Sequence, residues 1–362
     1  MFKLIAEENG ARTGELKTAH GTITTPAFMP VATKATVKTL NTQELKETQT
    51  DTIIANAFHL YITALEAIRD AGGLHNFMNW NEKIFTDSGG FQIIRKDFKF
   101  KITENGIEYT DPKNGEKQTY TPELCMKIQD DLGSDVAMVL DHCPPHNATP
   151  DEVIEATNRT TRWAERSKKA HNPRKEQQLF AIIQGGTNPK LREKSTHELT
   201  EIDFDGYAIG GLSIGETKEL MQKTLRYTTP LLPSEKPRYL MGVGSTRELL
   251  NAITTGIDIF DSTYPTRNAR HASITTRDGR INITRQKYKN DQRPLEEDCN
   301  CYTCQHHTRA YLHHLFKQKE LLALRLATIH NIHHTQKFIQ EIQTAIREGE
   351  LQRFREDNEK NC

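Results

Sequence analysis

Three aspartates follow short apolar runs, and each stands where a parallel strand would end. They are Asp87 in FTDSGGFQ, Asp141 in VAMVLDHC and Asp261 in GIDIFDSTYP. A carboxylate can attack an anomeric carbon and hold it covalently while a second carboxyl group serves as acid and base. One aspartate after a strand more often caps the next loop. Three of them on one face, with glycines beside them, favour sugar-transfer chemistry.

Glycine doublets accompany these acids at 89–90, 185–186 and 210–211. Glycine lets backbone N–H groups approach a ligand closely, and such groups could bind a carbonyl oxygen of a flat heterocycle. Turn geometry alone would also explain any single doublet. Phe91 and Met241 could sandwich a base between an aromatic ring and a soft thioether, although both residue types are also common in protein cores.

Three of the six cysteines, Cys299, Cys301 and Cys304, fall within six residues. Such crowding in a chain expected to be cytoplasmic favours a metal site over a disulfide framework. Three thiolates and one imidazole complete a tetrahedral Zn²⁺ site with no open position, so the ion would be structural. The spacing leaves the fourth ligand open among the histidines that follow: His306, His307, His313, His314, His330, His333 and His334.

A basic stretch runs from Pro265 to Arg293 and lies between Asp261 and the cysteines. It holds eight Lys and Arg residues against two aspartates in a chain with 48 basic and 48 acidic residues. A local basic surface beside an active face suits a polyanion such as RNA, although a solvated stretch would look similar.

The elements that position these residues must bring the ends of separate strands together. Near-continuous apolar runs alternate with helical segments such as 122–133, 150–171 and 245–254, a pattern typical of a parallel sheet covered on both faces. A (β/α)8 barrel is favoured over a doubly wound sheet, because only a barrel gathers all strand ends on one face. The first 60 residues predict short strands and turns, with a hairpin that closes the barrel bottom.

Composition excludes several classes of protein. The net charge is zero, which argues against a chain that coats nucleic acid by bulk charge. No apolar run has the length of a membrane span, and the start lacks the apolar core of a secretory signal, so a cytoplasmic protein is expected. No phosphate-binding loop or dinucleotide fingerprint occurs, so no nucleotide cofactor is expected.

Taken together, the segments resemble the tRNA-guanine transglycosylase (queuine tRNA-ribosyltransferase) family over nearly the whole chain. The resemblance is carried by ARTGELKTAHGTITTPAFMPVATKATVK (11–38), FTDSGGFQ, AIIQGG, GGLSIGE, YLMGVG, IDIFDSTYPTRNAR, CNCYTCQHHTRAYLHHL and LATIHN. It implies one (β/α)8 TIM barrel over 1–362, with a zinc-binding subdomain at 290–335. It also implies exchange of guanine at the tRNA wobble position for a 7-deazaguanine in queuosine biosynthesis.

The resemblance also implies roles for individual residues. Asp261 matches the nucleophile and Asp87 the general acid/base. The matching substrate-binding residues are Ser88, Phe91, Asp141, Cys143, Gln184, Gly211, Leu212 and Met241. Arg267 and Arg270 match tRNA-contacting positions. Cys299, Cys301, Cys304 and His330 match the ligands of one structural Zn²⁺, which selects His330 among the histidines. A homodimer is expected from the family.

The base that is inserted separates the branches of this family. Cys143 and Ile214 are typical of bacterial members, which use 7-aminomethyl-7-deazaguanine (preQ1), whereas users of the bulkier queuine tend to differ at both positions. His142 stands where bacterial members usually have Glu, which leaves the preference between preQ1 and queuine open. The tRNAs that are modified, and the role of the His-rich C-terminal helix and tail, stay open as well.

Three functions of other kinds compete with this reading. A non-catalytic partner subunit would keep the fold and the zinc but lose the nucleophile, whereas Asp261 and Asp87 are both present. A barrel glycosidase would explain the paired acids but not PTRNAR (265–270) or the cysteine cluster. A DNA-modifying relative differs only in its nucleic acid, and a comparison of tRNA with DNA as substrate would separate it.

Overall fold

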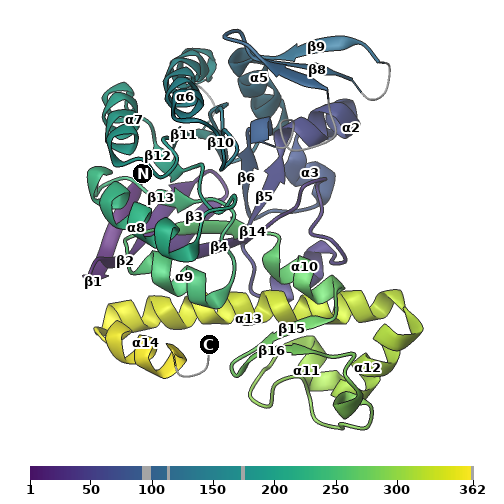
Figure 1. Ribbon diagram of the computed structural model, residues 1–362. Coiled ribbons are helices and arrows are strands. Elements are labelled where there is room, and N and C mark those ends of the chain that lie inside the picture. Colours follow the sequence, from purple (N-terminus) through teal and green to yellow (C-terminus); the bar gives the residue numbers. More distant parts are fainter. Residues whose placement is uncertain (92–98, 112–114, 173–175, 360–362) are drawn as a thin grey trace.

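The computed structural model describes residues 1–91, 99–111, 115–172 and 176–359. Its centre is an eight-stranded parallel sheet with the order β4-β14-β13-β12-β11-β10-β6-β5. The strands are β4 (Ala27–Pro30), β5 (Thr52–Asn56), β6 (Lys83–Asp87), β10 (Val136–Met138), β11 (Gln178–Ile183), β12 (Gly206–Ile209), β13 (Arg238–Leu240) and β14 (Ile259–Ser262). A parallel bridge between Val31 and Ile54 joins the two ends of this order. The sheet is therefore the predicted barrel (Figure 1).

Helices follow the strands and cover the outside of the barrel. They are α2 (Ala57–Asp70), α5 (Pro122–Leu132), α6 (Pro150–Ala170), α7 (Pro189–Ile202), α8 (Lys218–Thr228) and α9 (Thr246–Ile253). The helices predicted at 150–171 and 245–254 are confirmed, and each begins after a capping side chain, Thr149 or Ser245. Short α1 (Thr42–Glu47), α3 (Leu74–Met78) and the 3-10 turn η1 (Thr229–Leu231) complete the connections.

Aromatic side chains fill the interior of the barrel. Phe85 on β6 makes edge contacts with Phe180 on β11 and Tyr239 on β13, with ring centroids 5.7 and 6.2 Å apart. These strands are not neighbours in the sheet, so the rings meet across the barrel axis. The packed layer forms a rigid floor from which the C-terminal strand ends carry polar side chains.

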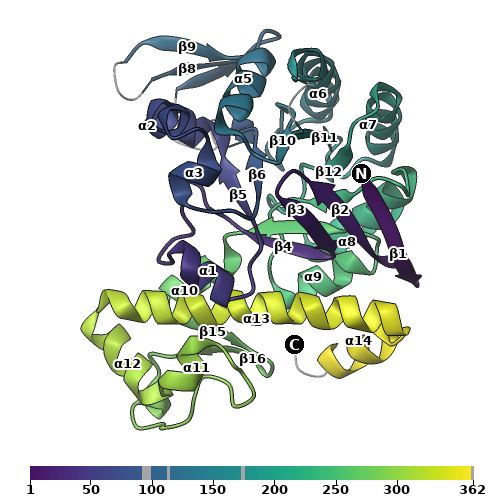
Figure 2. The same ribbon diagram turned by 180° about the vertical axis from the view of Figure 1, so that it is seen from behind.

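A three-stranded antiparallel sheet covers the opposite, N-terminal end of the barrel. It consists of β1 (Phe2–Glu8), β2 (Ala11–Thr18) and β3 (Gly21–Thr25), which lie across the barrel in Figure 2. The buried Arg12 pairs with Asp258, just before β14, and the backbone N–H of His20 donates to Asp135, just before β10. The predicted closure of the bottom is confirmed. The first 60 residues also supply two barrel strands, β4 and β5, which the prediction of short strands and turns did not identify.

A second small sheet follows β6. It consists of β7 (Phe100–Ile102), β8 (Ile107–Thr110) and β9 (Lys117–Tyr120), and the sequence pattern does not predict it. The Tyr120 hydroxyl donates to the backbone carbonyl of Ser88 at 2.8 Å. The sheet thus supports the loop that follows Asp87.

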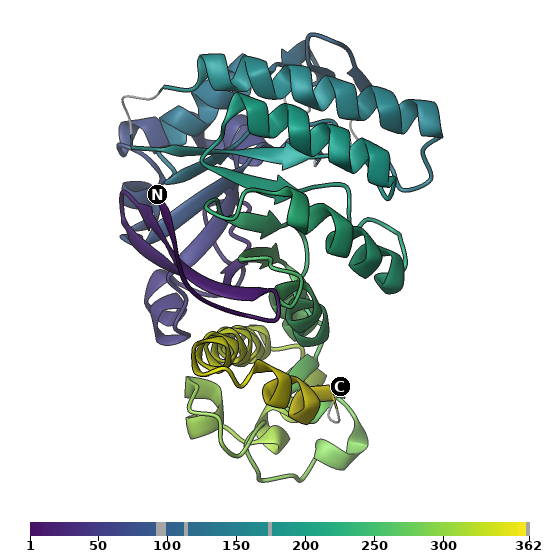
Figure 3. The same ribbon diagram turned by 90° about the vertical axis from the view of Figure 1, so that its left-hand side faces the viewer.

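The C-terminal elements lie together on one side of the barrel (Figure 3). They are α10 (Tyr264–Arg270), β15 (Ser273–Thr276), β16 (Gly279–Asn282), η2 (Gln286–Tyr288), α11 (Tyr302–His306), α12 (Arg309–Gln318), α13 (Leu321–Glu348) and α14 (Leu351–Glu359). The long α13 runs between the barrel and the elements β15, β16, α11 and α12, and it contacts β1, β2, β4 and α10. The predicted segment 290–335 covers α11, α12 and the first half of α13. None of the helices in the described part of the chain has both the length and the apolar character of a membrane crossing.

Candidate active site and metal centre

Two of the predicted aspartates lie near enough at the mouth of the barrel to interact electrostatically. Asp87 ends β6 and Asp261 lies in β14, with β4 and β5 between these strands. Burial raises the pKa of Asp87 to about 7, and the negative charge of Asp261 adds to the rise. Hydrogen bonds from the Asn56 side chain and from the backbone of Gly89 and Ala57 act in the opposite direction. A carboxyl group with such a pKa can both donate and accept a proton near neutral pH.

The surroundings of Asp261 hold one of its two oxygens. The Tyr239 hydroxyl donates to Oδ1 at 2.6 Å, and the Gly242 N–H donates to the same oxygen at 3.0 Å. Burial raises the pKa of Asp261, and these two hydrogen bonds oppose the rise because they favour the ionised form. Within the described residues, no donor binds Oδ2.

The third aspartate forms a separate polar cluster with Gln184 at the end of β11. The Gln184 Nε2 donates to Asp141 Oδ2 at 2.7 Å, and both side chains are buried. Burial raises the pKa of Asp141 to about 6, against hydrogen bonds from Gln184 and Ser88. The Gln184 Oε1 is buried and accepts no hydrogen bond from the described residues. Such an atom suits a ligand that brings its own donor.

The glycine doublet after β12 is required by the packing around Gln184. A Cβ atom on Gly210 would lie 2.8 Å from Gln184 Nε2, and one on Gly211 would lie 2.6 Å from Gln184 Oε1. Gly211 also has a φ of +67°, which L side chains rarely adopt. Glycine here brings the loop backbone within reach of whatever Gln184 binds.

The loop beyond Gly211 orients the peptide bond between Leu212 and Ser213. The Ser213 N–H donates to the Glu216 carboxylate, and the Ile214 N–H donates to its second oxygen at 3.1 Å. Because a trans peptide is planar, the Leu212 carbonyl points away from Glu216. This peptide therefore presents an acceptor rather than a donor on the side opposite Glu216.

The remaining predicted substrate-binding residues lie on the same loops. Cys143 and Leu212 are buried, and Met241 is half-buried against the core. Phe91 is half-buried and directly precedes the undescribed residues 92–98. The stacking role of Phe91 and Met241 stays a prediction.

The predicted tRNA-contacting residues lie on α10, directly after Asp261. Arg267 is exposed, and Arg270 is half-buried with its Nε donating to the Thr266 carbonyl at 3.2 Å. Elsewhere in the basic stretch, Arg277 pairs with Glu341 and Arg293 with Asp291. The charges of Arg277 and Arg293 are thus partly neutralised. Arg267 and Arg270 lie nearer the mouth of the barrel.

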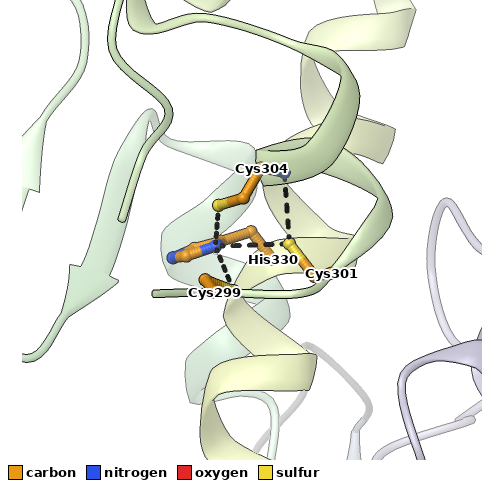
Figure 4. A group of neighbouring side chains, drawn as sticks. All are labelled: Cys299, Cys301, Cys304 and His330. Carbon is orange, nitrogen blue, oxygen red and sulfur yellow. Dashed lines mark hydrogen bonds between the residues drawn. The ribbon is translucent and has the colours of Figure 1, made fainter. Parts of the chain in front are cut away.

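A buried cluster of Cys299, Cys301, Cys304 and His330 lies between α11 and α13 (Figure 4). The His330 Nδ1 is 3.7, 3.6 and 3.3 Å from the three sulfur atoms in that order. The His330 Nε2 faces the Thr275 carbonyl at 2.8 Å, which directs Nδ1 toward the sulfurs. The cluster could hold a metal ion, and three thiolates with one imidazole fit Zn²⁺ well.

Three other histidines considered as the fourth ligand have partners elsewhere. His333 lies 2.8 Å from the Asn300 side chain, His334 lies 3.3 Å from Glu296, and His313 lies 2.9 Å from the Ile283 carbonyl. The prediction that His330 joins the three cysteines is confirmed by the geometry of the cluster.

Several residues of the site were missed by the sequence analysis. Tyr239 holds Asp261, Asn56 contacts Asp87, and the fully buried Arg192 lies beneath the glycine doublets. Tyr239 could have been found, because alternation along a strand puts it on the same side as Met241, two residues later. Asn56 could have been noticed as the capping residue of α2, whose side chain accepts from the His59 N–H, but its contact with Asp87 has no local signal. Arg192 has no local signal in the sequence.

Comparison with known proteins places these features in one family. A family model described as queuine tRNA-ribosyltransferase matches residues 7–361. Proteins named queuine tRNA-ribosyltransferase from Pelotomaculum thermopropionicum and Bacillus subtilis are 49% and 47% identical over 352 residues, which is 97% of this chain and 95% and 92% of theirs. One from Staphylococcus aureus is 48% identical over 97% of this chain and 93% of its own. The chain therefore belongs to the queuine tRNA-ribosyltransferase family of glycosyltransferases.

Proposed function

We propose that this protein exchanges guanine at the wobble position of tRNA for the 7-deazaguanine preQ1, in queuosine biosynthesis. The observation that carries the proposal is the pair Asp87 and Asp261, two electrostatically coupled carboxyl groups at one barrel mouth. Beside them, Asp141 and Gln184 form a buried polar pair with an unused acceptor. A displacement through a covalent intermediate needs the two carboxyl groups of Asp87 and Asp261. Recognition of a base edge needs the polar pair Asp141 and Gln184.

The chemistry divides into two displacements at the ribose C1′. Asp261 attacks C1′ through Oδ2, since Oδ1 is held by Tyr239 and Gly242. The bond to guanine breaks as the protonated Asp87 donates its proton to the leaving base. The resulting Asp87 carboxylate then takes the N9 proton of the incoming base. That base attacks C1′ and releases Asp261, so the tRNA backbone stays intact throughout.

One set of groups reads both bases, because guanine and preQ1 share the same recognition edge. The Asp141 carboxylate accepts from ring and amino N–H groups, while Gln184, Ser88 and the Gly211 N–H complete the contacts. Phe91 and Met241 stack on the two faces of the base, and Cys143 lines the pocket.

The substituent at position 7 distinguishes preQ1 from guanine. The Leu212 carbonyl points away from Glu216 and can accept from an aminomethyl group. Ile214 lines the same pocket as Gln184 and Gly211, and its branched side chain favours the small aminomethyl group over the larger substituent of queuine.

The C-terminal elements beside the barrel would bind the tRNA and the metal ion. Arg267 and Arg270 on α10 contact phosphates of the anticodon loop, and the target nucleotide leaves its stack to reach Asp261. Cys299, Cys301, Cys304 and His330 would hold Zn²⁺, which would cross-link α11 to α13. A homodimer in the cytoplasm is the expected form of the enzyme.

A base-exchange assay tests this function. The purified full chain is incubated with tRNA that carries guanine at the wobble position, together with labelled preQ1 or labelled queuine. We expect preQ1 to be incorporated. Incorporation of queuine alone would contradict the assignment to preQ1. Incorporation into DNA alone, or no incorporation of either base by the folded, zinc-loaded protein, would contradict the proposed function.

Replacement of Gly211 by alanine is expected to raise the KM for the base by at least about tenfold, the equivalent of one lost hydrogen bond. The new methyl group would lie 2.6 Å from Gln184 Oε1 and displace the side chain that reads the base. Steady-state kinetics with varied preQ1 measures the effect.

Gly349→Ala is the matched control for this variant. Gly349 has a similar φ of +72°, but a Cβ there meets nothing within 4 Å. Equal kinetics of Gly211→Ala and Gly349→Ala would mean that Gly211 does not approach the base.

The affinity for the base is expected to depend on pH through Asp141. The pKa of this carboxyl group is raised to about 6, so it is ionised above that pH and gains a proton below it. A protonated Asp141 loses part of its capacity to accept from the base, and the KM for preQ1 should therefore rise as pH falls through about 6.

Measurement of KM between about pH 5 and pH 8 tests this dependence around the pKa. In Asp141→Asn the KM should be high throughout and should lack the rise at low pH. A wild-type KM that stays flat down to the acid end of the range would show that Asp141 does not read the base as a carboxylate.

A further inference from the structure

A fully buried arginine lies beneath the loops that would read the base. Arg192, in the first turn of α7, uses its guanidinium group to bind three backbone carbonyls. Its Nε donates to Gly186 at 2.7 Å, Nη1 to Ile183 at 2.9 Å and Nη2 to Gly210 at 2.7 Å. These carbonyls belong to the last residue of β11, to the loop that follows it and to the loop after β12. One side chain therefore joins the two loops that carry Gln184 and Gly211.

The bond to Gly210 determines which way the next N–H points. In a planar trans peptide the carbonyl of one residue and the N–H of the next point in opposite directions. Since the Gly210 carbonyl points at Arg192, the Gly211 N–H points away from it. No group among the described residues accepts a hydrogen bond from this N–H. Arg192 thus turns a spare backbone donor away from the protein interior.

The same face of α7 also holds the backbone of Gln184. Ser195, three residues after Arg192 and on the same side of the helix, accepts from the Gln184 N–H at 3.2 Å. The Gly210 N–H in turn donates to the Ile183 carbonyl at 3.0 Å. Gln184 and Gly211 are therefore positioned relative to each other through a single helix turn.

We propose that Arg192 is a positioning residue that aims the Gly211 N–H at the carbonyl oxygen at position 6 of the base. The inference rests on the proposed function, since it concerns the same pocket. The planar guanidinium is required because three carbonyls in different directions must be bound at once. A lysine ammonium would keep the charge but not the planar arrangement of N–H donors that binds the three carbonyls.

Arg192→Lys tests the proposal in the base-exchange assay with the full chain. We expect the KM for preQ1 to rise about tenfold, since one hydrogen bond to the base is misaligned. The KM for tRNA and the kcat at saturating base should stay within about threefold, because neither Asp261 nor α10 contacts Arg192.

Arg12→Lys is the matched control. Arg12 is also buried and also binds backbone carbonyls, those of Ser234 and Lys236, but it lies at the opposite end of the barrel. Both variants should lower the melting temperature, while only Arg192→Lys should raise the KM for preQ1. Equal KM values for preQ1 in the two variants would mean that Arg192 has a purely structural role, and would overturn the proposal.

A change in the substrate separates positioning from a general loosening of the pocket. An analogue of preQ1 with hydrogen in place of the oxygen at position 6 cannot accept from Gly211. With this analogue the wild type and Arg192→Lys should differ by less than about twofold. A tenfold difference that persists with the analogue would contradict the proposed aim of the Gly211 N–H.

If Arg192→Lys does not fold, Ser195→Ala tests whether this turn of α7 positions the groups that read the base, because Ser195 accepts from the Gln184 N–H. Its control is Ser167→Ala, because Ser167 is likewise buried on a helix but its hydroxyl has no partner among the described residues. We expect the KM for preQ1 to rise only in Ser195→Ala, and equal values would overturn the proposal. Failure of the wild type to exchange any base would instead refute the proposed function itself.

Discussion

Asp261→Asn is expected to abolish base exchange, with a loss of at least about 10³-fold in rate. An amide cannot attack the ribose carbon, so no covalent intermediate forms. The fold should persist, because the Asn oxygen can still accept from Tyr239 and Gly242, which bind Oδ1 in the wild type. The loss should therefore be chemical and not structural.

Two measurements establish this result. The first is incorporation of labelled preQ1 into tRNA, which should vanish. The second is a protein–RNA adduct on a denaturing gel, which the wild type should form and the variant should not. Asp205→Asn serves as control, since Asp205 precedes β12 at the opposite end of the barrel and its carboxylate accepts from the Leu179 N–H. Residual exchange with an adduct in Asp261→Asn would assign the nucleophile to another residue, with Asp87 as the first alternative.

Cys304→Ser is expected to remove the metal and to destabilise the C-terminal elements. A hydroxyl is a poor ligand for Zn²⁺, and the remaining buried thiols would lose the charge that stabilises them as thiolates. Binding of a structural zinc ion contributes directly to folding, so a fall of roughly 10 °C in the melting temperature is expected. Zinc content measured by mass spectrometry should drop from one ion per chain to nearly none.

His333→Gln is the control for this variant, because His333 lies three residues from His330 but faces Asn300. It should keep its zinc and its stability. Retention of zinc by Cys304→Ser, or its loss from His333→Gln, would contradict the assigned ligand set.

Loss of the metal should also weaken tRNA binding more than it affects the binding of the base. Asn331, next to His330 on α13, donates to the Pro265 carbonyl at 3.1 Å and to the Ser273 carbonyl at 3.0 Å. These bonds hold the start of α10 and the hairpin β15–β16. In the zinc-depleted protein the KM for tRNA should rise more than the KM for preQ1.

The alternation of strands and helices could be predicted because it depends on the local pattern of apolar and polar residues. The apolar runs that end in Asp87, Asp141 and Asp261 all proved to be barrel strands, with polar side chains at their C-terminal ends. The strand β4 escaped notice because it is only four residues long and its flanks are rich in Thr and Pro. The sheet β7–β9 has no strong period either, and its strands are held mainly by pairing with one another.

The sequence by itself determined the features that depend on near neighbours. Cap residues, glycines in tight turns and the spacing of Cys299, Cys301 and Cys304 act over a few residues, so they can be read without the fold. The tertiary structure alone decided what depends on distant partners. The pKa of Asp87 follows from burial and from Asp261, and the orientation of Gly211 follows from Arg192. Desolvation and long-range hydrogen bonds exist only once the barrel has closed, and no local pattern contains them.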